Sequence, residues 1–367
     1  MFFNIFFFCK YKHLNKVKVV VVQKVYIFDN IIMTKDKAQL EIKTLIEKKT
    51  KCVIIPHKNP DGDALGSSLA LNLFLKKKGL DSIVISPNDY PKFLKWMPGE
   101  KEVVNFEINN SKAIKYLEEA ELVFAIDFND PQRSGNLFKY IKNSFDKLIM
   151  IDHHENPKNF SSIKLSLPKY SSTAEMVYDL INSIDSGLID DKIASCLYAG
   201  IMTDTGSFKF SSTTPQTHYA IGKLIENGAN NSKIHQNIYD TFSYNRIKLL
   251  GIALKNILKL EFGPFVIITL NKDELEKCSF KKGDSEGFVN YGLAIDGIKL
   301  SIILIENIDE EIIKISFRSK GDFPVNVFAE KYFNGGGHHN AAGGISHENL
   351  EKTKNKLIKS LKSFVYE

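Results

Sequence analysis

Short apolar runs rich in β-branched residues alternate with longer segments of helical spacing between about residues 50 and 205. The apolar runs are 52–56 (CVIIP), 82–86 (SIVIS), 122–127 (LVFAID) and 147–152 (KLIMID). The helical segments are 64–78, which is followed by the stop signal Gly79, and then 172–184 and 190–202. This alternation is typical of a parallel sheet with crossover helices. The first part of the chain is therefore predicted to be an α/β domain.

The pattern changes after about residue 257. Residues 258–270 predict a hairpin that turns at 262–264, and residues 299–308 and 311–320 predict two more strands. Residues 325–333 and 350–364 have helical spacing and flank a glycine-rich loop at 335–344. Between the two regions, 215–227 and 234–256 read as helices without strand signal. We therefore expect a smaller α+β domain, 257–367, joined to the first domain, 33–214, by a helical linker, 215–256.

The first 32 residues differ from the rest of the chain. Their apolar runs are interrupted by lysines, are too short to span a bilayer and lack a small-residue cleavage site. Met33 then begins a segment, 33–49, with the spacing of an amphipathic helix. We expect Met33 to be the biological start and 1–32 to be a mis-assigned start or a disordered extension. A membrane-associating leader is the alternative.

Charge restricts the class of substrate. The formal net charge is +6, but residues 1–32 hold five Lys and one Asp and so supply most of it. A nearly neutral body predicts neither an extended duplex-binding surface nor membrane binding, so a nucleotide substrate should be short. The four cysteines show neither a pairing pattern nor metal spacing, which favours a reducing cytoplasm.

Only three residues of the chain are arginine, namely Arg133, Arg246 and Arg318. A coding bias toward lysine explains a shortage of this kind. An arginine that persists against such a bias is a hint that a planar, bidentate donor is needed at its position. We interpret Arg246, which lies in the linker, as part of a solvated helix face.

Acidic and histidine residues gather where the predicted strands end. In open parallel sheets the ligand crevice lies at the carboxyl ends of the strands. Taken singly, such an Asp is usually a turn or cap residue, and such a His a surface or core residue. Four separate segments that deliver these types to one edge are harder to explain in that way. The residues are His57, Asp61, Asp63, Asp127, Asp152, His153, His154 and Asp204.

The donor set indicates which metals would bind. Carboxylate and imidazole without thiolate suit Mn²⁺ best, with Mg²⁺ or Co²⁺ as alternatives, and suit structural zinc poorly. Six ligands drawn from these eight residues, four Asp and two His, exceed the needs of one catalytic ion but match two ions that share a carboxylate. Two such ions about 3.5–4 Å apart can activate a hydroxide and stabilise an in-line phosphoryl displacement. The sequence therefore predicts two divalent metal ions as cofactors.

These segments carry a family resemblance. HKNPDGDALG, the Asp127 segment, the literal Asp152–His153–His154 and TDTGSF resemble the four motifs of the DHH phosphoesterase superfamily. VNVFAEKYFNGGGHHNAAGG, residues 325–344, resembles the DHHA1 domain that accompanies it. The resemblance spans roughly residues 40–365 and implies a parallel-sheet DHH catalytic domain, a DHHA1 substrate-binding domain and an active site between them.

The resemblance also implies a role for each site residue. It places His57, Asp61 and Asp127 at one metal, and Asp63, Asp127, His153 and Asp204 at the other. Asp127 would bridge the ions, Asp152 would orient its neighbours, and His154 would face the scissile phosphate as electrophile or proton donor. Ser171, Ser172 and Thr173 are explained by helix capping, with a supporting contact near the metals as an alternative. The implied substrate contacts are Arg133, Arg318, Ser319, Gly336, Gly337 and His338.

Arg133 has a second interpretation, as a surface residue that caps a turn, and His339 is treated as variable. Within the superfamily, the compact architecture is most similar to bacterial enzymes that hydrolyse very short oligoribonucleotides to mononucleotides. These enzymes also act as phosphatases on 3′-phosphoadenosine-5′-phosphate (PAP). The alternatives are a linear or cyclic dinucleotide phosphodiesterase, or a nucleotide-binding sensor without catalysis. The expected partners are short RNA, a dinucleotide or PAP, with a homodimer left open.

Overall fold

The computed structural model describes residues 34–307 and 310–366. The chain separates into two compact units, 1–33 and 34–367, and everything described below lies in the second. The expectations for residues 1–32 and for Cys9 fall outside the described residues. Within the described part, no helix is long and apolar enough to cross a membrane. Cys52, Cys196 and Cys278 are buried free thiols.

The first sheet has six parallel strands in the order β3-β2-β1-β4-β5-β6. All four predicted strands are confirmed within one residue. β3 and β6 were not predicted, because two and four residues give too little periodicity to recognise. The strands are β1 (Lys51–Pro56), β2 (Asp81–Ser86), β3 (Val104–Asn105), β4 (Leu122–Ile126), β5 (Leu148–Asp152) and β6 (Ile163–Ser166).

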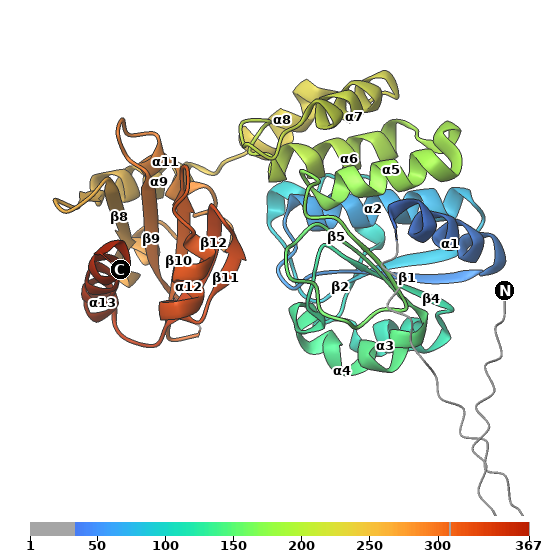
Figure 1. Ribbon diagram of the computed structural model, residues 1–367, viewed down its shortest axis with the longest axis horizontal. Helices are drawn as coiled ribbons and strands as arrows, with labels where there is room; N and C mark the ends of the chain where they lie inside the picture. Colours follow the sequence, from blue (N-terminus) through green and yellow to red (C-terminus); the bar gives the residue numbers. More distant parts are fainter. Residues whose placement is uncertain (1–33, 308–309, 367) are drawn as a thin grey trace, which may run out of the picture. The chain divides into compact units, whose positions relative to one another are not determined.

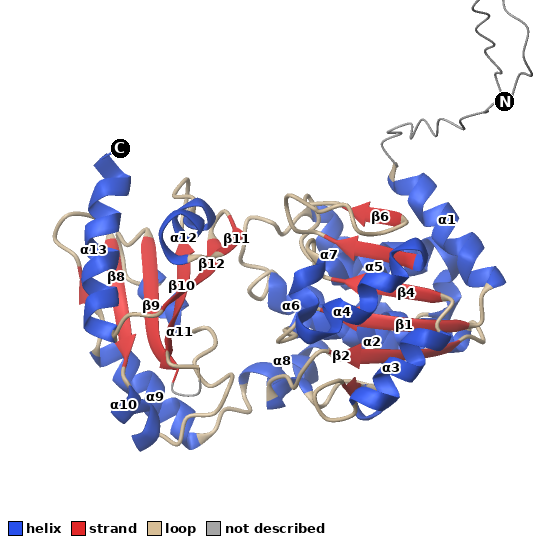
Figure 2. Ribbon diagram, turned by 90° about the horizontal axis from the view of Figure 1, so that it is seen from below, coloured by secondary structure: helices blue, strands red, loops and turns tan. Residues whose placement is uncertain are grey.

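Helices cover both faces of this sheet. Figure 1 shows α1, α2, α5 and α6 over one face and α3 and α4 over the other, and Figure 2 shows the same layers from below. The helices expected around 33–49, 64–78, 172–184 and 190–202 are all present, and Gly79 takes the left-handed conformation (φ 87°) that ends α2. The helices are α1 (Lys35–Lys48), α2 (Gly62–Lys77), α3 (Asn110–Glu119), α4 (Phe138–Ile141), α5 (Thr173–Asp185) and α6 (Asp191–Asp204).

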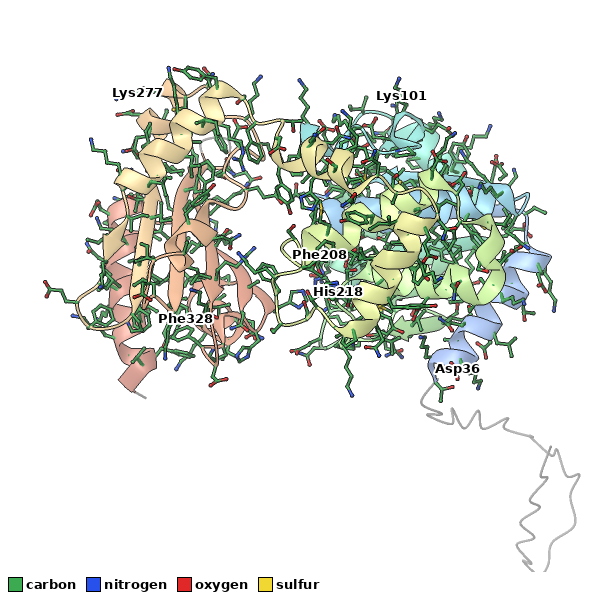
Figure 3. All side chains as sticks on the ribbon, turned by 90° about the horizontal axis from the view of Figure 1, so that it is seen from above. Asp36, Lys101, Phe208, His218, Lys277 and Phe328 are labelled. Carbon is green, nitrogen blue, oxygen red and sulfur yellow. The ribbon has the colours of Figure 1, made fainter. Side chains whose placement is uncertain are left out.

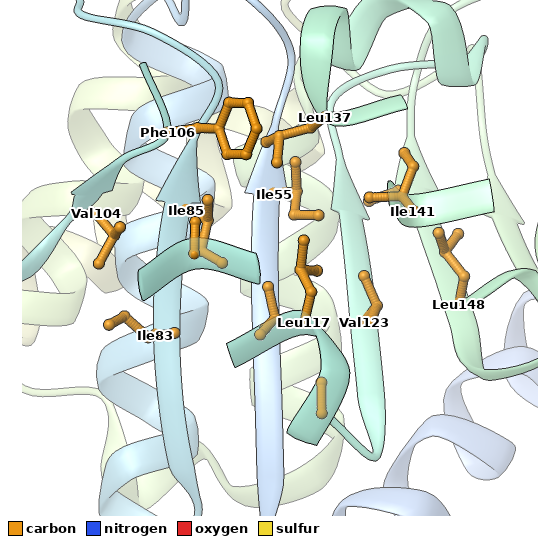
Figure 4. Close-up of a cluster of buried hydrophobic side chains, with 14 of the residues drawn as sticks. Ile55, Ile83, Ile85, Val104, Phe106, Leu117, Val123, Leu137, Ile141 and Leu148 are labelled. Carbon is orange, nitrogen blue, oxygen red and sulfur yellow. The ribbon is translucent and has the colours of Figure 1, made fainter. Parts of the chain in front are cut away.

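Alternation along the strands builds the core beneath the sheet. Val53 and Ile55 of β1 point to the same face and belong to one buried cluster with Phe106 and with Leu117 of α3. Figure 4 shows Ile55, Phe106 and Leu117 in this cluster. Each fully buried aliphatic or aromatic side chain of this kind contributes about 1.5–3 kcal/mol. Apolar packing on both faces fixes the strands, and with them the loops at their carboxyl ends.

The linker prediction was partly wrong. The expected helix 215–227 is confirmed as α7 (Pro215–Glu226), but the expected helix 234–256 is two helices, α8 (Asn231–Tyr239) and α9 (Tyr244–Lys255). α9 starts anew because the Ser243 hydroxyl accepts the backbone N–H of Arg246. The hydrophobic spacing continues across this break, so it predicted one helix, but the N-cap at Ser243 starts a second one.

The second sheet is mixed, in the order β11-β12-β10-β9-β8-β7. The predicted hairpin is confirmed as the antiparallel pair β7–β8, and the two further strands are confirmed as the antiparallel pair β9–β10. Phe328 of α12, labelled in Figure 3, packs with Phe317 of β10 in the core of this part. The strands are β7 (Leu258–Lys259), β8 (Phe265–Leu270), β9 (Leu300–Asn307), β10 (Ile312–Ser319), β11 (Gly336–His338) and β12 (Ala341–Ser346). The helices are α10 (Lys272–Lys277), α11 (Phe288–Leu293), α12 (Val325–Phe333) and α13 (Leu350–Tyr366).

The segment 335–344 is not the glycine-rich loop that the sequence predicted. It forms the antiparallel pair β11–β12, with Gly336 opposite Gly343. A Cβ on Gly335 would lie 1.9 Å from the Gly343 carbonyl oxygen, and Gly337 has φ 145°. These glycines permit close backbone approach within a hairpin rather than an open loop, a distinction that composition alone cannot make.

Candidate metal centre and active site

The candidate site lies where the order of the first sheet reverses. β1 and β4 are adjacent at the centre of the sheet, and the chain runs outward from them in opposite directions. Such a switch point leaves a crevice beyond the carboxyl ends of the strands. His57 follows β1 directly, and Asp127 follows β4 directly. Two of the three residues predicted at the first metal, His57 and Asp127, therefore emerge from adjacent strands.

His57, Asp61 and Asp127 form the first candidate ligand group, called the first ligand group below, with one donor atom from each within 4.8 Å of the others. His57 Nε2 lies 3.7 Å from Asp61 Oδ2 and 3.5 Å from Asp127 Oδ2. The His57 ring is oriented by its other nitrogen, since Nδ1 lies 2.9 Å from the Lys58 carbonyl oxygen. His57 and Asp127 are buried, whereas the Asp61 side chain is 48% exposed. The group is thus open to solvent on the Asp61 side.

Asp63, His153 and Asp204 form the second ligand group. His153 Nε2 lies 3.4 Å from Asp204 Oδ2 and 3.7 Å from Asp127 Oδ1. Asp127 therefore presents Oδ2 to the first group and Oδ1 to the second. This is the position that a carboxylate shared by two cations requires.

The sequence predicted Asp127 to be the last residue of its strand, but Asp127 lies just after the strand. β4 ends at Ile126, and Asp127 takes a left-handed conformation with φ 65°. A non-glycine residue in this region is under strain unless its surroundings hold it. The backbone N–H of Asp127 donates to the Ile151 carbonyl, and its Oδ1 accepts the Thr173 hydroxyl at 2.8 Å. The turn aims the carboxylate between the two groups.

The N-terminus of α5 supports the site, which capping alone did not predict. Ser172 does cap this helix, as expected, through the backbone N–H of Glu175. In addition, the backbone N–H groups of Thr173 and Ala174 donate to the two carboxylate oxygens of Asp63 at 2.7 and 2.8 Å. Each of these oxygens keeps a free lone pair for a cation. The contact joins segments more than 100 positions apart, so local sequence gave no signal for it.

Asp152 orients His154. Asp152 is fully buried, its Oδ1 lies 2.8 Å from His154 Nδ1, and its Oδ2 accepts the His154 backbone N–H at 3.1 Å. The His154 side chain is 15% exposed. Because Nδ1 is engaged by the carboxylate, Nε2 is the ring nitrogen left for a ligand. His153 is oriented differently, with Nδ1 3.3 Å from the Tyr170 carbonyl oxygen.

Two of the predicted substrate contacts share one rung of the second sheet. Arg318 pairs with Ala341, which pairs in turn with His338, so both side chains stand on the same face. The His338 ring stacks on that of His154, with centroids 4.6 Å apart and planes 21° apart. Burial and the nearby His154 and His153 lower the pKa of His338 to about 3, so its imidazole is neutral. Gly336 and Gly337 precede His338 in the same strand, β11.

The other two predicted substrate contacts differ from each other. Arg133 lies near the candidate site, because its charge acts on two imidazoles there: it opposes the hydrogen bonds with Asp127 and Asp61 that raise the pKa of His57, and it adds to the burial that lowers the pKa of His338. Its guanidinium has neither a hydrogen bond nor an ion pair within residues 34–307 and 310–366. The Ser319 hydroxyl, by contrast, donates to the Phe323 carbonyl and accepts from Asn340. A substrate contact by Ser319 therefore stays a prediction without a structural contact to support it.

The prediction of a solvated face for Arg246 was wrong. The guanidinium carbon lies 3.6 Å from the ring centroid of Phe242 and 5.0 Å from that of Phe288. Its Nη2 donates to the Glu286 carbonyl oxygen at 2.7 Å. Planar guanidinium groups stack well on aromatic rings, so Arg246 packs the start of α9 against the Glu286 segment.

A strained turn follows Asp204, the last predicted metal ligand in the chain. Gly206, Ser207 and Phe208, directly after Asp204 and Thr205, all have positive φ, at 57°, 60° and 66°. The turn is held by the Thr205 hydroxyl, which accepts the Phe208 backbone N–H at 3.0 Å. Figure 3 shows the Phe208 ring beside His218, and their centroids are 5.9 Å apart. Of these three residues, only Gly206 is of a type that indicates a left-handed conformation from sequence.

Several carboxylates crowd the site and repel one another. Burial, and then the charges of Asp127 and Asp61, raise the pKa of Asp204 to about 7 against the pull of His153. Burial and the same carboxylates also raise the pKa of Asp63. Burial opposes the charged form of Asp127, but its hydrogen bond with His57 and three imidazoles hold its pKa well below the usual range. Cations bound among these oxygens would relieve the repulsion, so the donor set fits divalent metal ions.

Metal-free protein should lose stability as pH rises from 6 to 8. The folded-state pKa of Asp204, about 7, exceeds its ordinary value of 3.8, so folding becomes less favourable across that interval. Burial would lower the pKa of His57, but hydrogen bonds with Asp127 and Asp61 raise it to about 10, so its stabilisation also declines above its ordinary pKa of 6.5. We expect a lower Tm at pH 8 than at pH 6, and a larger increase on adding Mn²⁺ at pH 8. Scanning calorimetry checks this, and a metal-free Tm that rises over the interval would contradict it.

Comparison with known proteins identifies the family. The model of the DHH family, N-terminal domain, matches residues 51–201, and that of the DHHA1 domain matches residues 264–367. The chain is 30% identical to the bifunctional oligoribonuclease and PAP phosphatase NrnA of Thermus thermophilus, over 84% of this chain and 88% of that protein. It is 28% identical to the cyclic-di-AMP phosphodiesterase GdpP of Bacillus subtilis, over 86% of this chain and 49% of that protein.

A solved structure agrees with these matches. An exopolyphosphatase-related protein from Bacteroides fragilis superposes with a TM-score of 0.86 and 38% identity, covering 90% of this chain and 96% of that one. The DHH match contains five of the six predicted metal ligands, and Asp204 follows it by three residues. Metal dependence is a property of this family, and the grouped carboxylates and imidazoles of this chain are consistent with it. The chain belongs to the DHH family of phosphoesterases, which are hydrolytic enzymes, and carries a C-terminal DHHA1 domain.

Proposed function

We propose that this protein is a two-metal phosphodiesterase that hydrolyses very short oligoribonucleotides to mononucleotides and also dephosphorylates PAP. The observation that carries the proposal is the position of Asp127, with one oxygen 3.5 Å from His57 Nε2 and the other 3.7 Å from His153 Nε2. Two-metal phosphoryl transfer uses two ions about 3.5–4 Å apart, and a carboxylate in this position could hold both. The similarity to a protein named for both activities supports the choice of substrates.

Two divalent ions, with Mn²⁺ preferred and Mg²⁺ or Co²⁺ as alternatives, would be held by the two ligand groups. When bound, they would supply Lewis-acid stabilisation of the reacting phosphate and a nucleophile that is active at neutral pH. Asp63 would serve as a ligand while the α5 amides keep its carboxylate in place. Mixed carboxylate and imidazole donors favour Mn²⁺ over harder ions.

His154 would act on the leaving group. Asp152 Oδ1 contacts Nδ1 of His154, which would leave Nε2 for a phosphate bound between the ligand groups. An imidazole held in this way can donate a hydrogen bond or a proton to the oxygen of the departing nucleoside. Asp152 would fix the orientation of this ring, as hydrogen-bonded carboxylates commonly do behind functional imidazoles.

The DHHA1 domain would bind the remainder of the substrate. Arg318 and His338, on one rung of its sheet, would contact a phosphate, with Gly336 and Gly337 allowing close backbone approach. Arg133 would contact a phosphate from the DHH side. A body with little net positive charge suits a short substrate, so we propose neither long duplex nor membrane partners. A homodimer is compatible with this function.

Chain length of the substrate tests the proposal. With Mn²⁺, the kcat/KM for a labelled RNA dinucleotide should exceed that for a 30-mer by at least about tenfold, because binding energy is confined to one or two phosphates. PAP should be dephosphorylated under the same conditions. Product analysis at initial rates measures both activities. Preferred cleavage of the 30-mer would overturn the proposed substrate class.

The second candidate is a linear or cyclic dinucleotide phosphodiesterase, favoured by the match to the cyclic-di-AMP phosphodiesterase GdpP. It would use the same ligand groups, so ligand substitutions cannot separate the two functions. A panel of linear dinucleotides, PAP and cyclic dinucleotides at one Mn²⁺ concentration does separate them. Cyclic dinucleotides as the best substrates, with PAP left intact, would select the second candidate.

A further inference from the structure

The loop that carries two of the proposed metal ligands contains a residue in an unfavourable backbone conformation. Asn59 lies midway between His57 and Asp61 and has φ 57°, in the left-handed region. For a residue with a side chain this region is strained, somewhat less for asparagine than for other residues. A change of this one dihedral would reorient His57 and Asp61 relative to each other. Something must therefore hold Asn59.

Asn88, in the segment after β2, holds it through a reciprocal pair of hydrogen bonds. The Asn59 backbone N–H donates to Asn88 Oδ1 at 2.7 Å, and Asn88 Nδ2 donates to Asn59 Oδ1 at 2.8 Å. Asn88 is only 4% exposed. Lys282, from the DHHA1 domain, donates to the same Asn59 oxygen at 2.6 Å. The peptide N–H and the side chain of Asn59 are thus both bound.

Asn88 is itself fixed in place. Its carbonyl accepts the Ser86 hydroxyl at 2.6 Å, and its Nδ2 also donates to the Asp89 carbonyl at 3.1 Å. Ser86 is the last residue of β2, which pairs with β1 in the sheet. The position of Asn88 is therefore set by the same strands that position His57.

The energies decide whether this contact matters. Each hydrogen bond of the pair stabilises the left-handed conformation, so the pair offsets the strain at Asn59. Without it, the loop would populate other conformations, and apparent metal affinity falls in proportion to the competent fraction. A loss of about 1.4 kcal/mol lowers that affinity about tenfold.

We propose that Asn88 is a positioning residue for the metal site formed by His57, Asp61 and Asp127. It does not contact a cation or the substrate, and it acts by keeping Asn59 left-handed, so that His57 and Asp61 are preset before a cation arrives. This inference rests on the proposed function only in taking that ligand group to be a cation site.

Mn²⁺ binding to metal-free, full-length protein tests the inference. Free Mn²⁺ is followed by electron paramagnetic resonance, which needs no turnover. We expect Asn88→Ala to weaken one of two classes of Mn²⁺ site about tenfold and to leave the other within about twofold. Dinucleotide hydrolysis by the variant should recover to near the wild-type kcat at high Mn²⁺, since Asn88 takes no part in the chemistry.

Asn72→Ala is the matched control. Asn72 is also a buried asparagine, in α2, and it accepts the Ser82 hydroxyl at 2.8 Å away from the proposed ligands. We expect a similar loss of Tm in the two variants but a change of Mn²⁺ affinity only in Asn88→Ala. Equal Mn²⁺ affinities for Asn88→Ala and wild type, or equal weakening in both variants, would overturn the inference.

A second pair of variants tests the conformation directly. Asn59→Gly keeps the left-handed turn and the backbone N–H that Asn88 accepts, whereas Asn59→Ala strains the turn. Asn59→Ala should therefore weaken Mn²⁺ binding more than Asn59→Gly, and the reverse order would contradict the mechanism. Asp61→Asn identifies the affected class. If that variant leaves both classes unchanged, the metal assignment in the proposed function is wrong, an outcome distinct from failure of the Asn88 inference alone.

Discussion

Asp127→Asn should lower turnover of a dinucleotide by about 10³-fold or more. An amide cannot provide an anionic oxygen to each of the two proposed cations. The Lewis-acid contribution of such cations to phosphoryl transfer amounts to several kcal/mol, and about 1.4 kcal/mol corresponds to a factor of ten in rate. Asparagine is the chosen replacement because it tolerates the φ of 65° at this position. Its carbonyl can still accept the hydroxyl of Thr173. The measurements are initial rates and Mn²⁺ stoichiometry.

Asp146→Asn is the control for this experiment, since Asp146 is an exposed aspartate of the same domain. It should retain wild-type turnover. Turnover of Asp127→Asn close to the wild-type rate would overturn the shared-carboxylate assignment. If wild-type protein hydrolysed none of the nucleotides yet bound them, the chain would instead be a nucleotide sensor without catalysis. The presence of every predicted ligand within the two groups argues against that alternative.

His154→Asn should lower kcat by about 10²–10⁴-fold while Mn²⁺ binding stays near wild type. The range is that of a general acid or a hydrogen-bond donor to the leaving oxygen. His154 is placed beside the ligand groups, but its Nδ1 is committed to Asp152. The loss should be much smaller with bis(p-nitrophenyl) phosphate, because nitrophenolate leaves without a proton. Steady-state kinetics with both substrates give the comparison.

His347→Asn is the matched control, because His347 is an exposed histidine outside the site. It should leave both rates unchanged. An equal loss on the two substrates would mean that His154 stabilises the phosphate itself rather than the leaving group. A loss of one Mn²⁺ ion from His154→Asn would instead make His154 a metal ligand, and the proposed division of roles would be wrong.

The parts of the fold that were predictable are those with long, regular patterns. β1, β2, β4 and β5 are buried on both faces, so they read as continuous apolar runs. β3 and β6 are too short to show a period. The break before α9 depends on a single N-cap, and the hairpin β11–β12 has the composition of a loop. Local sequence carried too little information to settle these elements.

Side-chain surroundings were less predictable than strands. Arg246 has the sequence context of an exposed helix residue, yet two aromatic rings and the Glu286 carbonyl surround its guanidinium. Ser319 lies next to Arg318, but its hydroxyl is occupied by Phe323 and Asn340. Thr173 was explained by capping, with a supporting contact near the metals as the alternative, and the contact with Asp127 that the structure shows comes from the packing of α5. Each case depends on a partner distant in the chain.

The sequence by itself determined the α/β class, the carboxylate and imidazole donors and the strand ends that carry most of them, because these follow from residue type and local periodicity. Only the tertiary structure decided that Asp127 turns left-handed between two ligand groups and that α5 holds Asp63. It also decided that Arg318 and His338 share a rung and that Asn88 holds Asn59. These contacts join residues that are far apart in the chain and close in space. Strand register and helix packing set them, and no local stretch of sequence contains both partners.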